Sequence, residues 1–224
     1  MPQKELIKKK EISYDLPGRE LKLCVVENIE ALITDVNDPD KVPCWADIWP
    51  AAYGLARYLW EEVHFPPGAR VLELGTGLGL PGIVCSLKGA QAVLSDFNPL
   101  ALELAHENAR RNGADVELLL EDWRTFACRE KFDYLLAADI LYEPRLNPFL
   151  GEIFCRNLKP GGKLFVSHPE RRVTADFLEE WYNPRFFTQQ KILREVELEG
   201  TLLPCYDIAI HILKFLPEKQ AKRV

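Results

Sequence analysis

The sequence predicts an α/β fold built on a mostly parallel sheet, and three observations lead to that prediction. Short apolar runs alternate with helix-like segments from residue 70 onward, the pattern of strands joined by helical crossovers. Glycines stand directly after the first of these runs, at Gly75, Gly77 and Gly79. Polar residues follow the next three runs, at the strand ends where open parallel sheets bind their ligands.

The composition is that of an ordinary globular protein. The chain has 224 residues, of which 47% are hydrophobic and 28% charged, and this excludes disordered, collagen-like and coiled-coil classes. A net charge of −6 argues against nucleic-acid binding through the phosphate backbone. No apolar run reaches the ~18 residues of a membrane helix, and the first residues contain no secretory signal, so no membrane association is expected.

Cysteine and histidine usage gives no sign of a metal site. The six cysteines and four histidines are scattered, and no two cysteines form a C-x-x-C pair. A structural zinc site is therefore not expected, and reduced thiols in a cytoplasmic protein are the simplest interpretation.

The amino-terminal part is expected to contain strands and then a helix. Residues 11–35 predict two or three strands, with a turn at 15–18 where Pro and Gly follow each other. A helix is expected from Pro50 to about Trp60, because Pro suits a first helical position and apolar residues then recur at helical spacing.

Five strands are predicted in the alternating region, at residues 71–74, 92–95, 116–120, 132–138 and 163–166. Helices are predicted between or after them, ending at about Leu87 and then spanning 99–112, 146–157 and 174–181. Asn98 and Gly113 are typical of a helix start and a helix end. Residues 159–162 (KPGG) predict a turn before the fifth strand.

The carboxyl-terminal part reads as two further strands, 190–198 and 206–215, joined at Glu199-Gly200. A hairpin of this kind makes at least one late strand antiparallel to the sheet. Helices are expected on both sheet faces, with right-handed crossovers between parallel strands.

A glycine-rich loop follows the first strand of the alternating region, in the run Glu73-Leu74-Gly75-Thr76-Gly77-Leu78-Gly79. Glycines at this place let the backbone turn tightly and let a ligand lie against bare peptide groups. The dinucleotide pattern G-x-G-x-x-G would need a glycine at position 80, where the chain has Leu80. A strand-to-helix turn without a ligand is the alternative for the loop taken alone.

Acidic residues follow the next two strands. Asp96 stands at the end of the second strand, 21 residues after Gly75, where a carboxylate can accept both hydroxyls of an adenosine ribose. Glu121-Asp122-Trp123 follows the third strand, and an acceptor beside a flat indole suits an adenine amine and its ring. The alternatives are a loop aspartate that caps a turn and an amphipathic surface loop.

The fourth strand ends in Asp139-Ile140-Leu141-Tyr142. An aspartate at the mouth of a buried strand loses hydration unless a donor meets it, and Tyr142 can place its hydroxyl and ring beside the same pocket. An Asp139 that only caps the next turn is the alternative. Because the four motifs follow four successive strands, their joint placement favours one shared ligand site.

These motifs together resemble the seven-strand S-adenosylmethionine-dependent methyltransferases. The resemblance rests on VLELGTGLGLPGI, Asp96, the EDW run and DILYEP, and it covers about residues 40–170. More narrowly, the D-x-x-Y spacing of Asp139 and Tyr142 is similar to the mark of the family-16 protein-lysine methyltransferases. The segment from Trp49 to Leu59 also resembles that family's helix before the first strand.

The resemblance implies a Rossmann-like, seven-strand, mostly parallel sheet with helices on both faces, an antiparallel late strand and an amino-terminal β extension. It further implies that residues 1–45 form the extension and residues 46–224 the methyltransferase domain. The cofactor would be S-adenosyl-L-methionine.

Site residues are also implied by the resemblance. Those expected to bind the cofactor are Trp49, Glu73, Gly75, Thr76, Gly77, Asp96, Asp122, Trp123 and Ala138. The glycine loop would line the methionine half, Asp96 would hold the ribose, Asp122 or Trp123 the adenine, and Trp49 would close the pocket. For Trp49, a core aromatic at a helix start is the alternative. Asp139 and Tyr142 would shape the place where a substrate lysine meets the methyl group, with Asp139 as a positioner and not a dedicated base.

The implied function is methylation of lysine side chains of a protein partner, by in-line transfer to a deprotonated amine. A methyltransferase for a small amine or metabolite, or a non-catalytic cofactor-binding module, are the alternatives. A nicotinamide-dependent oxidoreductase is disfavoured by Leu80 and by the position of Glu73. His168, after the fifth strand, is left outside the core site, because a lone histidine at a strand end is more often structural.

Overall fold

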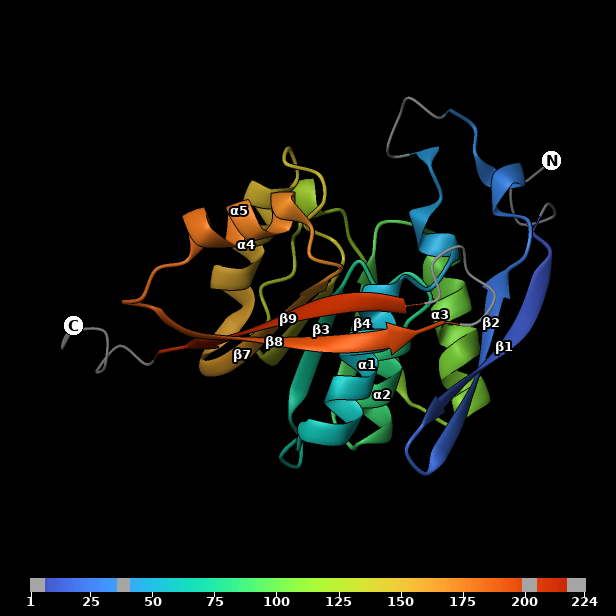
Figure 1. Ribbon diagram of the computed structural model, residues 1–224, viewed down its shortest axis with the longest axis horizontal. Helices are drawn as coiled ribbons and strands as arrows, with labels where there is room; N and C mark the ends of the chain where they lie inside the picture. Colours follow the sequence, from blue (N-terminus) through green and yellow to red (C-terminus); the bar gives the residue numbers. More distant parts are fainter. Residues whose placement is uncertain (1–6, 36–40, 199–204, 217–224) are drawn as a thin grey trace.

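The computed structural model describes residues 7–35, 41–198 and 205–216 (Figure 1). Its main sheet contains β3 (Arg70–Leu74), β4 (Gln91–Asp96), β5 (Val116–Leu120), β6 (Phe132–Ala138), β7 (Leu158–His168), β8 (Phe187–Glu197) and β9 (Cys205–Phe215). The strand order is β5-β4-β3-β6-β7-β9-β8. Strand β9 runs antiparallel to both of its neighbours, and the other pairs are parallel. The predicted fold class, with its antiparallel late strand, is confirmed; the predicted turn at 199–200 lies outside the described residues.

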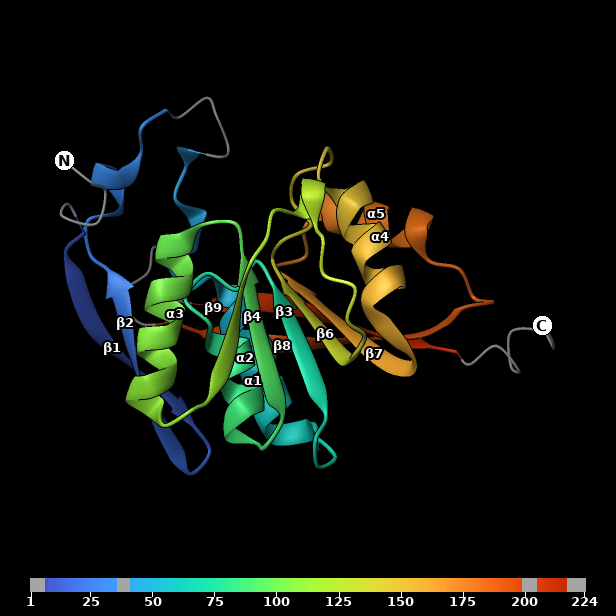
Figure 2. The ribbon, with the colours of Figure 1, turned by 180° about the vertical axis from the view of Figure 1, so that it is seen from behind.

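Helices cover both faces of this sheet (Figure 2). One face carries α1 (Pro50–Glu62), α2 (Leu80–Leu87) and α3 (Pro99–Asn112), and the other carries α4 (Asn147–Asn157) and α5 (Arg172–Trp181). Side chains alternate along a strand, so Val71 packs in the core beneath α1 and α2 while the adjacent Leu72 packs in the core beneath α4 and α5. Both cores are apolar, which fixes the sheet between its two helical layers.

An antiparallel hairpin, β1 (Lys9–Leu16) and β2 (Arg19–Val26), precedes the sheet. Its turn needs Gly18, whose φ of +78° lies in the left-handed region that favours glycine. The hairpin lies beside α3 in both views (Figures 1 and 2). The two or three strands predicted for residues 11–35 are thus two, spanning residues 9–26, and a short 3₁₀ helix, Ile29–Leu32, follows them. The division of the chain at residue 45 stays a prediction.

Two asparagine side chains of α3 bind the backbone of β2 as a neighbouring strand would. Asn108 accepts a 2.6 Å bond from the Cys24 N–H and donates to the Cys24 carbonyl at 3.1 Å. Asn112 pairs in the same way with Lys22, at 2.9 and 2.8 Å. Asn108 also donates to the carbonyl of Leu78 at 3.1 Å, so one buried amide joins the hairpin, α3 and the glycine loop.

The predicted turn at residues 159–162 is a bulge inside β7 and does not mark where that strand begins. Leu158 already pairs with Phe132, and the register then shifts before Tyr134 pairs with Lys163. Pro160 cannot donate a ladder hydrogen bond, and Gly161 has a φ of +85°, so the chain leaves the ladder there and rejoins it. Within the described ranges, no helix is long and apolar enough to cross a membrane.

Candidate functional site

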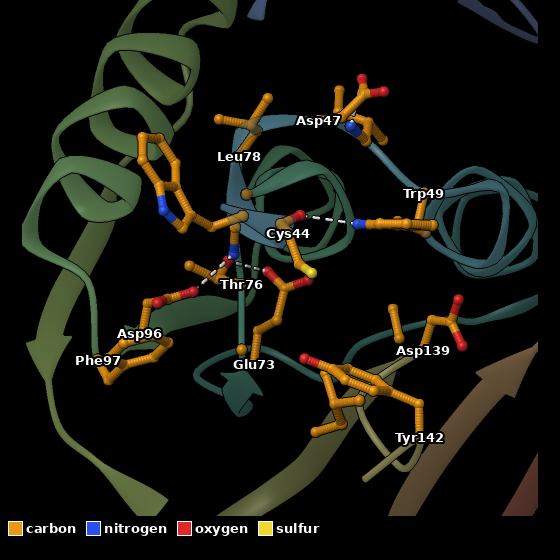
Figure 3. A pocket seen from close by; sticks show the side chains of 18 of the residues that line it. Cys44, Asp47, Trp49, Glu73, Thr76, Leu78, Asp96, Phe97, Asp139 and Tyr142 are labelled. Atoms are coloured by element: carbon orange, nitrogen blue, oxygen red, sulfur yellow. Dashed lines mark hydrogen bonds between the residues drawn. The ribbon is translucent and has the colours of Figure 1, made fainter. Parts of the chain in front are cut away.

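A pocket opens at the carboxyl ends of β3, β4 and β6, where the strand order reverses between β3 and β6 (Figure 3). Its lining includes every residue that the sequence placed in a site, namely Trp49, Glu73, Gly75, Thr76, Gly77, Asp96, Asp122, Trp123, Ala138, Asp139 and Tyr142. The switch point of an open parallel sheet is where such folds bind ligands. The structure thus brings these residues together, while their roles stay predictions.

The glycine loop lies bare against the pocket. The φ angles of Gly75, Gly77 and Gly79 are +61°, +52° and +89°, all in the left-handed region. A Cβ on Gly75 would lie 2.8 Å from both Ile140 Cγ2 and Trp123 Cζ2. Both the conformation and the space at this position therefore demand glycine.

Two carboxylates are buried beside this loop, Glu73 with 2% and Asp96 with 4% of their surface exposed. Glu73 Oε2 accepts hydrogen bonds from Thr76 Oγ1 at 2.6 Å and from the Gly82 N–H at 3.0 Å. Asp96 accepts from the Gly77 N–H at 3.0 Å and from the Asn98 N–H at 2.9 Å. In the described part of the chain neither carboxylate pairs with a cationic side chain, so the pocket suits a ligand that brings positive charge.

Burial also changes how these carboxylates titrate. Desolvation is the main cause that raises the pKa of Glu73 to about 8, and the nearby Asp96 raises it further. The hydrogen bonds from Thr76 and Gly82 act in the opposite direction and lower it. Desolvation likewise raises the pKa of Asp96 above its ordinary value. A bound cation would reverse this effect and favour the ionised carboxylates.

The stability of the protein is expected to fall as the pH rises toward 8, because of Glu73. The folded protein keeps the Glu73 proton up to a pKa of about 8, whereas the unfolded chain loses it near 4.5. The stabilising effect of protonation is thus complete below pH 4.5 and is lost as the pH rises through the folded pKa. Between the unfolded and the folded pKa, the unfolding free energy falls by about 1.4 kcal/mol for each pH unit.

This effect is measured by urea unfolding of the wild type and of Glu73→Gln at about pH 6 and about pH 7.5. The quantity to compare is the change in unfolding free energy between the two pH values. The glutamine variant should lack the Glu73 contribution, and Glu179→Gln, on the exposed face of α5, should behave as the wild type. Equal pH dependence of the wild type and Glu73→Gln would contradict the raised pKa.

Aromatic side chains line another part of the pocket. Trp123 begins a 3₁₀ turn whose N-cap, Asp122, accepts from the Arg124 N–H at 2.9 Å and forms an ion pair with the Arg124 side chain at 2.5 Å. Asp122 is therefore held by Arg124. Phe97, exposed and next to Asp96, also lines the pocket and was not predicted. An aromatic residue directly after a strand-end acid is the signal that could have identified it.

The wall opposite the sheet comes from residues before α1. Trp49 is 42% exposed, and its indole N–H donates to the Cys44 carbonyl at 2.7 Å (Figure 3). It lies at the mouth of the pocket and not in the core, unlike the alternative considered from sequence. Cys44 and Trp45 also line the pocket, and the Trp45 carbonyl lies so close that a Cβ on Gly77 would be 3.3 Å away. No motif marks either residue, so sequence reasoning missed them.

Asp139 is held by a partner that the sequence did not reveal. Its carboxylate oxygens accept from Arg171 Nε at 2.6 Å and Nη2 at 2.8 Å, a bidentate ion pair. Its N–H donates to the Ser167 carbonyl at 2.8 Å, and its φ of +54° is unusual for a residue other than glycine. Arg171 directly precedes α5, so a contact across 32 residues fixes the carboxylate.

Tyr142 stands at the mouth of the pocket with 41% of its surface exposed (Figure 3). Its phenol lies beside the Cys44 thiol, and desolvation raises the pKa of Tyr142 above its ordinary range. The phenol is therefore a neutral donor at physiological pH, with its ring left accessible beside Asp139.

His168 lies outside this pocket and packs against other buried side chains. It is buried and its Nε2 lies 3.1 Å from Nε2 of His211, whose Nδ1 contacts Gln189 at 2.9 Å. Burial lowers the pKa of both histidines to about 4, so the pair is neutral at physiological pH.

A glycine loop after the first strand and strand-end acids at the switch point define the class of Rossmann-like cofactor-binding enzymes. A family model described as a methyltransferase domain matches residues 66–210. The chain belongs to this methyltransferase family, which confirms the predicted class.

Curated relatives carry several protein methyltransferase names. A histidine protein methyltransferase 1 homolog of Dictyostelium discoideum is 32% identical over 127 residues, covering 54% of this chain and 41% of the relative. Histone-arginine methyltransferase METTL23 of Homo sapiens is 33% identical over 43% of this chain and 55% of the relative. The electron transfer flavoprotein beta subunit lysine methyltransferase of Rattus norvegicus is 31% identical, over 48% and 43%. The chain spans about half the length of these relatives.

Solved structures share the fold at low sequence identity. An N-methyltransferase, NodS of Bradyrhizobium japonicum in complex with S-adenosyl-L-homocysteine, has a TM-score of 0.57 at 15% identity, covering 84% of this chain and 97% of NodS. A putative transferase of Pyrococcus horikoshii has a TM-score of 0.56 at 15% identity, covering 94% of this chain and 74% of the other. These likenesses support the fold prediction.

Proposed function

We propose that this protein is an S-adenosylmethionine-dependent N-methyltransferase whose acceptor is a lysine side chain of a protein partner. One observation carries the proposal: the switch-point pocket joins two buried carboxyl groups, Glu73 and Asp96, to the Asp139–Tyr142 end, and neither has a cationic partner among the described residues. S-adenosylmethionine carries a sulfonium and an ammonium as well as a ribose, so its methionine half would bring positive charge near Glu73 while Asp96 would accept from the ribose hydroxyls.

The types of residue that line the pocket match the chemical groups of this cofactor. The bare backbone of Gly75 to Gly77 would hold the methionine half, with Glu73 behind it, and Asp96 would hold the ribose. Asp122 or Trp123 would hold the adenine, with Ala138 below the cofactor and Trp49 at the mouth. When bound, the cofactor supplies a methyl group that is already electrophilic, so the chain need not contribute a covalent nucleophile.

At the acceptor end the chain must hold an uncharged amine in line with the methyl group, and such positioning can be worth ~7–11 kcal/mol of the barrier. A lysine ammonium has an ordinary pKa of about 10.4, which an apolar mouth beside a sulfonium lowers. Tyr142 can pack against the lysine stem. Asp139 acts as a positioner in this proposal, because both of its oxygens already bind Arg171 and still have lone pairs for one more donor.

The names of the relatives support a protein acceptor, and the Asp139–Arg171 pair favours lysine over arginine. The guanidinium of Arg171 stays charged. It repels an acceptor arginine, which also keeps its charge, more than an acceptor lysine, whose amine can lose its proton. A cytoplasmic location is part of the proposal, consistent with six free cysteines. A small-molecule amine is the alternative acceptor.

Heat stability with and without S-adenosylmethionine, followed by incubation of cell extract with labelled cofactor, tests the proposed function. Binding to the native state should raise the melting temperature, and label should appear on lysine in macromolecules. Label found only in small solutes would favour a metabolite acceptor, and cofactor binding without any transfer would favour a non-catalytic module.

The Asp139→Asn variant tests the role of Asp139 in the same assay. An amide keeps one acceptor oxygen but loses the charge that holds Arg171, so transfer should fall while the cofactor-induced rise in melting temperature persists. Full methylation together with unchanged affinity for the target would show that Asp139 does not position the acceptor.

A further inference from the structure

A groove runs between α4 and α5 on the face of the sheet away from α1. Its floor is a stripe of α5 side chains at successive helical turns, Val173, Phe177 and Trp181. Phe177 stacks on Trp181 at 6.2 Å between ring centroids, and the edge of Phe154 packs on the same indole at 5.7 Å. Gly151 leaves room for this indole, because a Cβ there would be 2.8 Å from Trp181 Nε1. The floor is thus preformed and apolar.

The rim of the groove is acidic. Glu152 on α4, and Asp176 and Glu180 on α5, are exposed along it, and the basic residue among the lining residues is Arg172. Arg172 pairs with Asp176 at 3.5 Å. Among the described residues, Glu152 and Glu180 have no ion-pair partner, so the rim presents uncompensated negative charge that complements a basic ligand.

A buried acceptor among the residues that line the groove lacks a donor. Asn147, which lines the groove, is 3% exposed; its Nδ2 donates to the Leu141 carbonyl at 3.4 Å. Its Oδ1 accepts no hydrogen bond within the described ranges. Buried acceptors are rarely left unpaired, so the lining of the groove keeps unused hydrogen-bonding capacity at Asn147.

The groove adjoins the acceptor end of the cofactor pocket. Tyr142, Glu143 and Leu146 line the pocket, whereas Pro144 and Asn147, interleaved with them in sequence, line the groove. One short segment therefore forms the wall between the two cavities. A chain that places a lysine at Tyr142 can reach the groove within a few residues.

We infer that the α4–α5 groove is the docking surface for the protein substrate and that it binds a basic, partly apolar segment flanking the methylated lysine. This inference rests on the proposed function and extends it to the chemistry of the partner. The apolar floor would bury an aliphatic side chain, and the acidic rim would meet lysine or arginine. The same charge disfavours a nucleic acid.

The test measures binding of two short synthetic peptides by calorimetry, one of alternating lysine and leucine and one of alternating glutamate and leucine. The full chain is saturated with S-adenosyl-L-homocysteine so that the peptides cannot enter the cofactor pocket. The lysine peptide should bind the wild type at least about tenfold more tightly than the glutamate peptide. Equal binding of the two peptides overturns the inference.

Charge-reversal variants locate the binding. The double variant Glu152→Lys/Glu180→Lys should weaken binding of the lysine peptide by about tenfold, as expected for reversing two rim charges. Glu179→Lys makes the same change on the same helix at an exposed position outside the groove lining, and its effect should be clearly smaller. Equal loss in both variants, or no loss in the double variant, overturns the inference.

Steady-state transfer separates docking from catalysis. With any macromolecule that accepts label, Glu152→Lys/Glu180→Lys should raise KM while kcat and the cofactor-induced rise in melting temperature stay unchanged. If no macromolecule accepts label, the proposed function fails although the peptide measurement still reports on the groove. A double variant that changes the sedimentation of the protein but not its peptide binding would instead show that a second copy occupies the groove, and would overturn the inference.

Discussion

The Arg171→Met variant is expected to lose about 3 kcal/mol of unfolding free energy and most of its methyl transfer. The Asp139 side chain is 3% exposed and both of its oxygens bind Arg171, so the substitution leaves a buried carboxylate without its partner. Its melting temperature should fall by about 6–12 °C, and transfer by about a hundredfold because the acceptor end loses its geometry.

Two further variants show whether the pair is responsible. Arg172→Met changes the neighbouring arginine, whose side chain is 93% exposed, and should leave stability nearly unchanged. Adding Asp139→Asn to Arg171→Met removes the unpaired charge, so stability should recover in part while transfer does not. An Arg171→Met protein as stable and as active as the wild type would rule out the positioning role of the pair.

Gly75→Ala is expected to destabilise the fold by about 3 kcal/mol and to weaken cofactor binding by at least about tenfold. The φ of +61° strains any residue with a Cβ, and the new methyl group would meet Ile140 and Trp123 at 2.8 Å. Both neighbours line the pocket, so relief of the clash deforms it. Thermal melts with and without S-adenosylmethionine measure both effects.

Gly113→Ala is the matched control for this substitution. Gly113 has a φ of +73°, and a Cβ there would meet nothing within 4 Å. It should therefore show the strain alone, about 1–2 kcal/mol, and keep the full cofactor-induced rise in melting temperature. If the two variants lost cofactor binding equally, the contact of Gly75 with the pocket wall would not be the cause.

Most of the fold could be predicted because its signals are local. Asn98 and Gly113 mark both ends of α3 through cap geometry, and the structure has these caps in place. At Gly161 the sequence predicts a turn where the structure has a bulge, because Pro and Gly give the same local signal before a strand and at an interruption within one.

The candidate site was predictable where it follows strand ends. Glu73, Asp96 and Asp139 each stand at the end of a predicted strand, and parallel strands bring such ends to one edge. Arg171 and Cys44 reach the site from segments whose direction depends on tertiary packing, and neither carries a sequence pattern. A single sequence gives no signal for contacts between residues so far apart in the chain.

The amide of Asn108 has a consequence for how the molecule moves as a whole. Because it bonds both to Cys24 of the hairpin and to Leu78 of the glycine loop, loosening of either element leaves polar groups of the amide unsatisfied. The amino-terminal hairpin and the loop are therefore coupled parts of one cooperative unit, so local opening of the hairpin destabilises the loop.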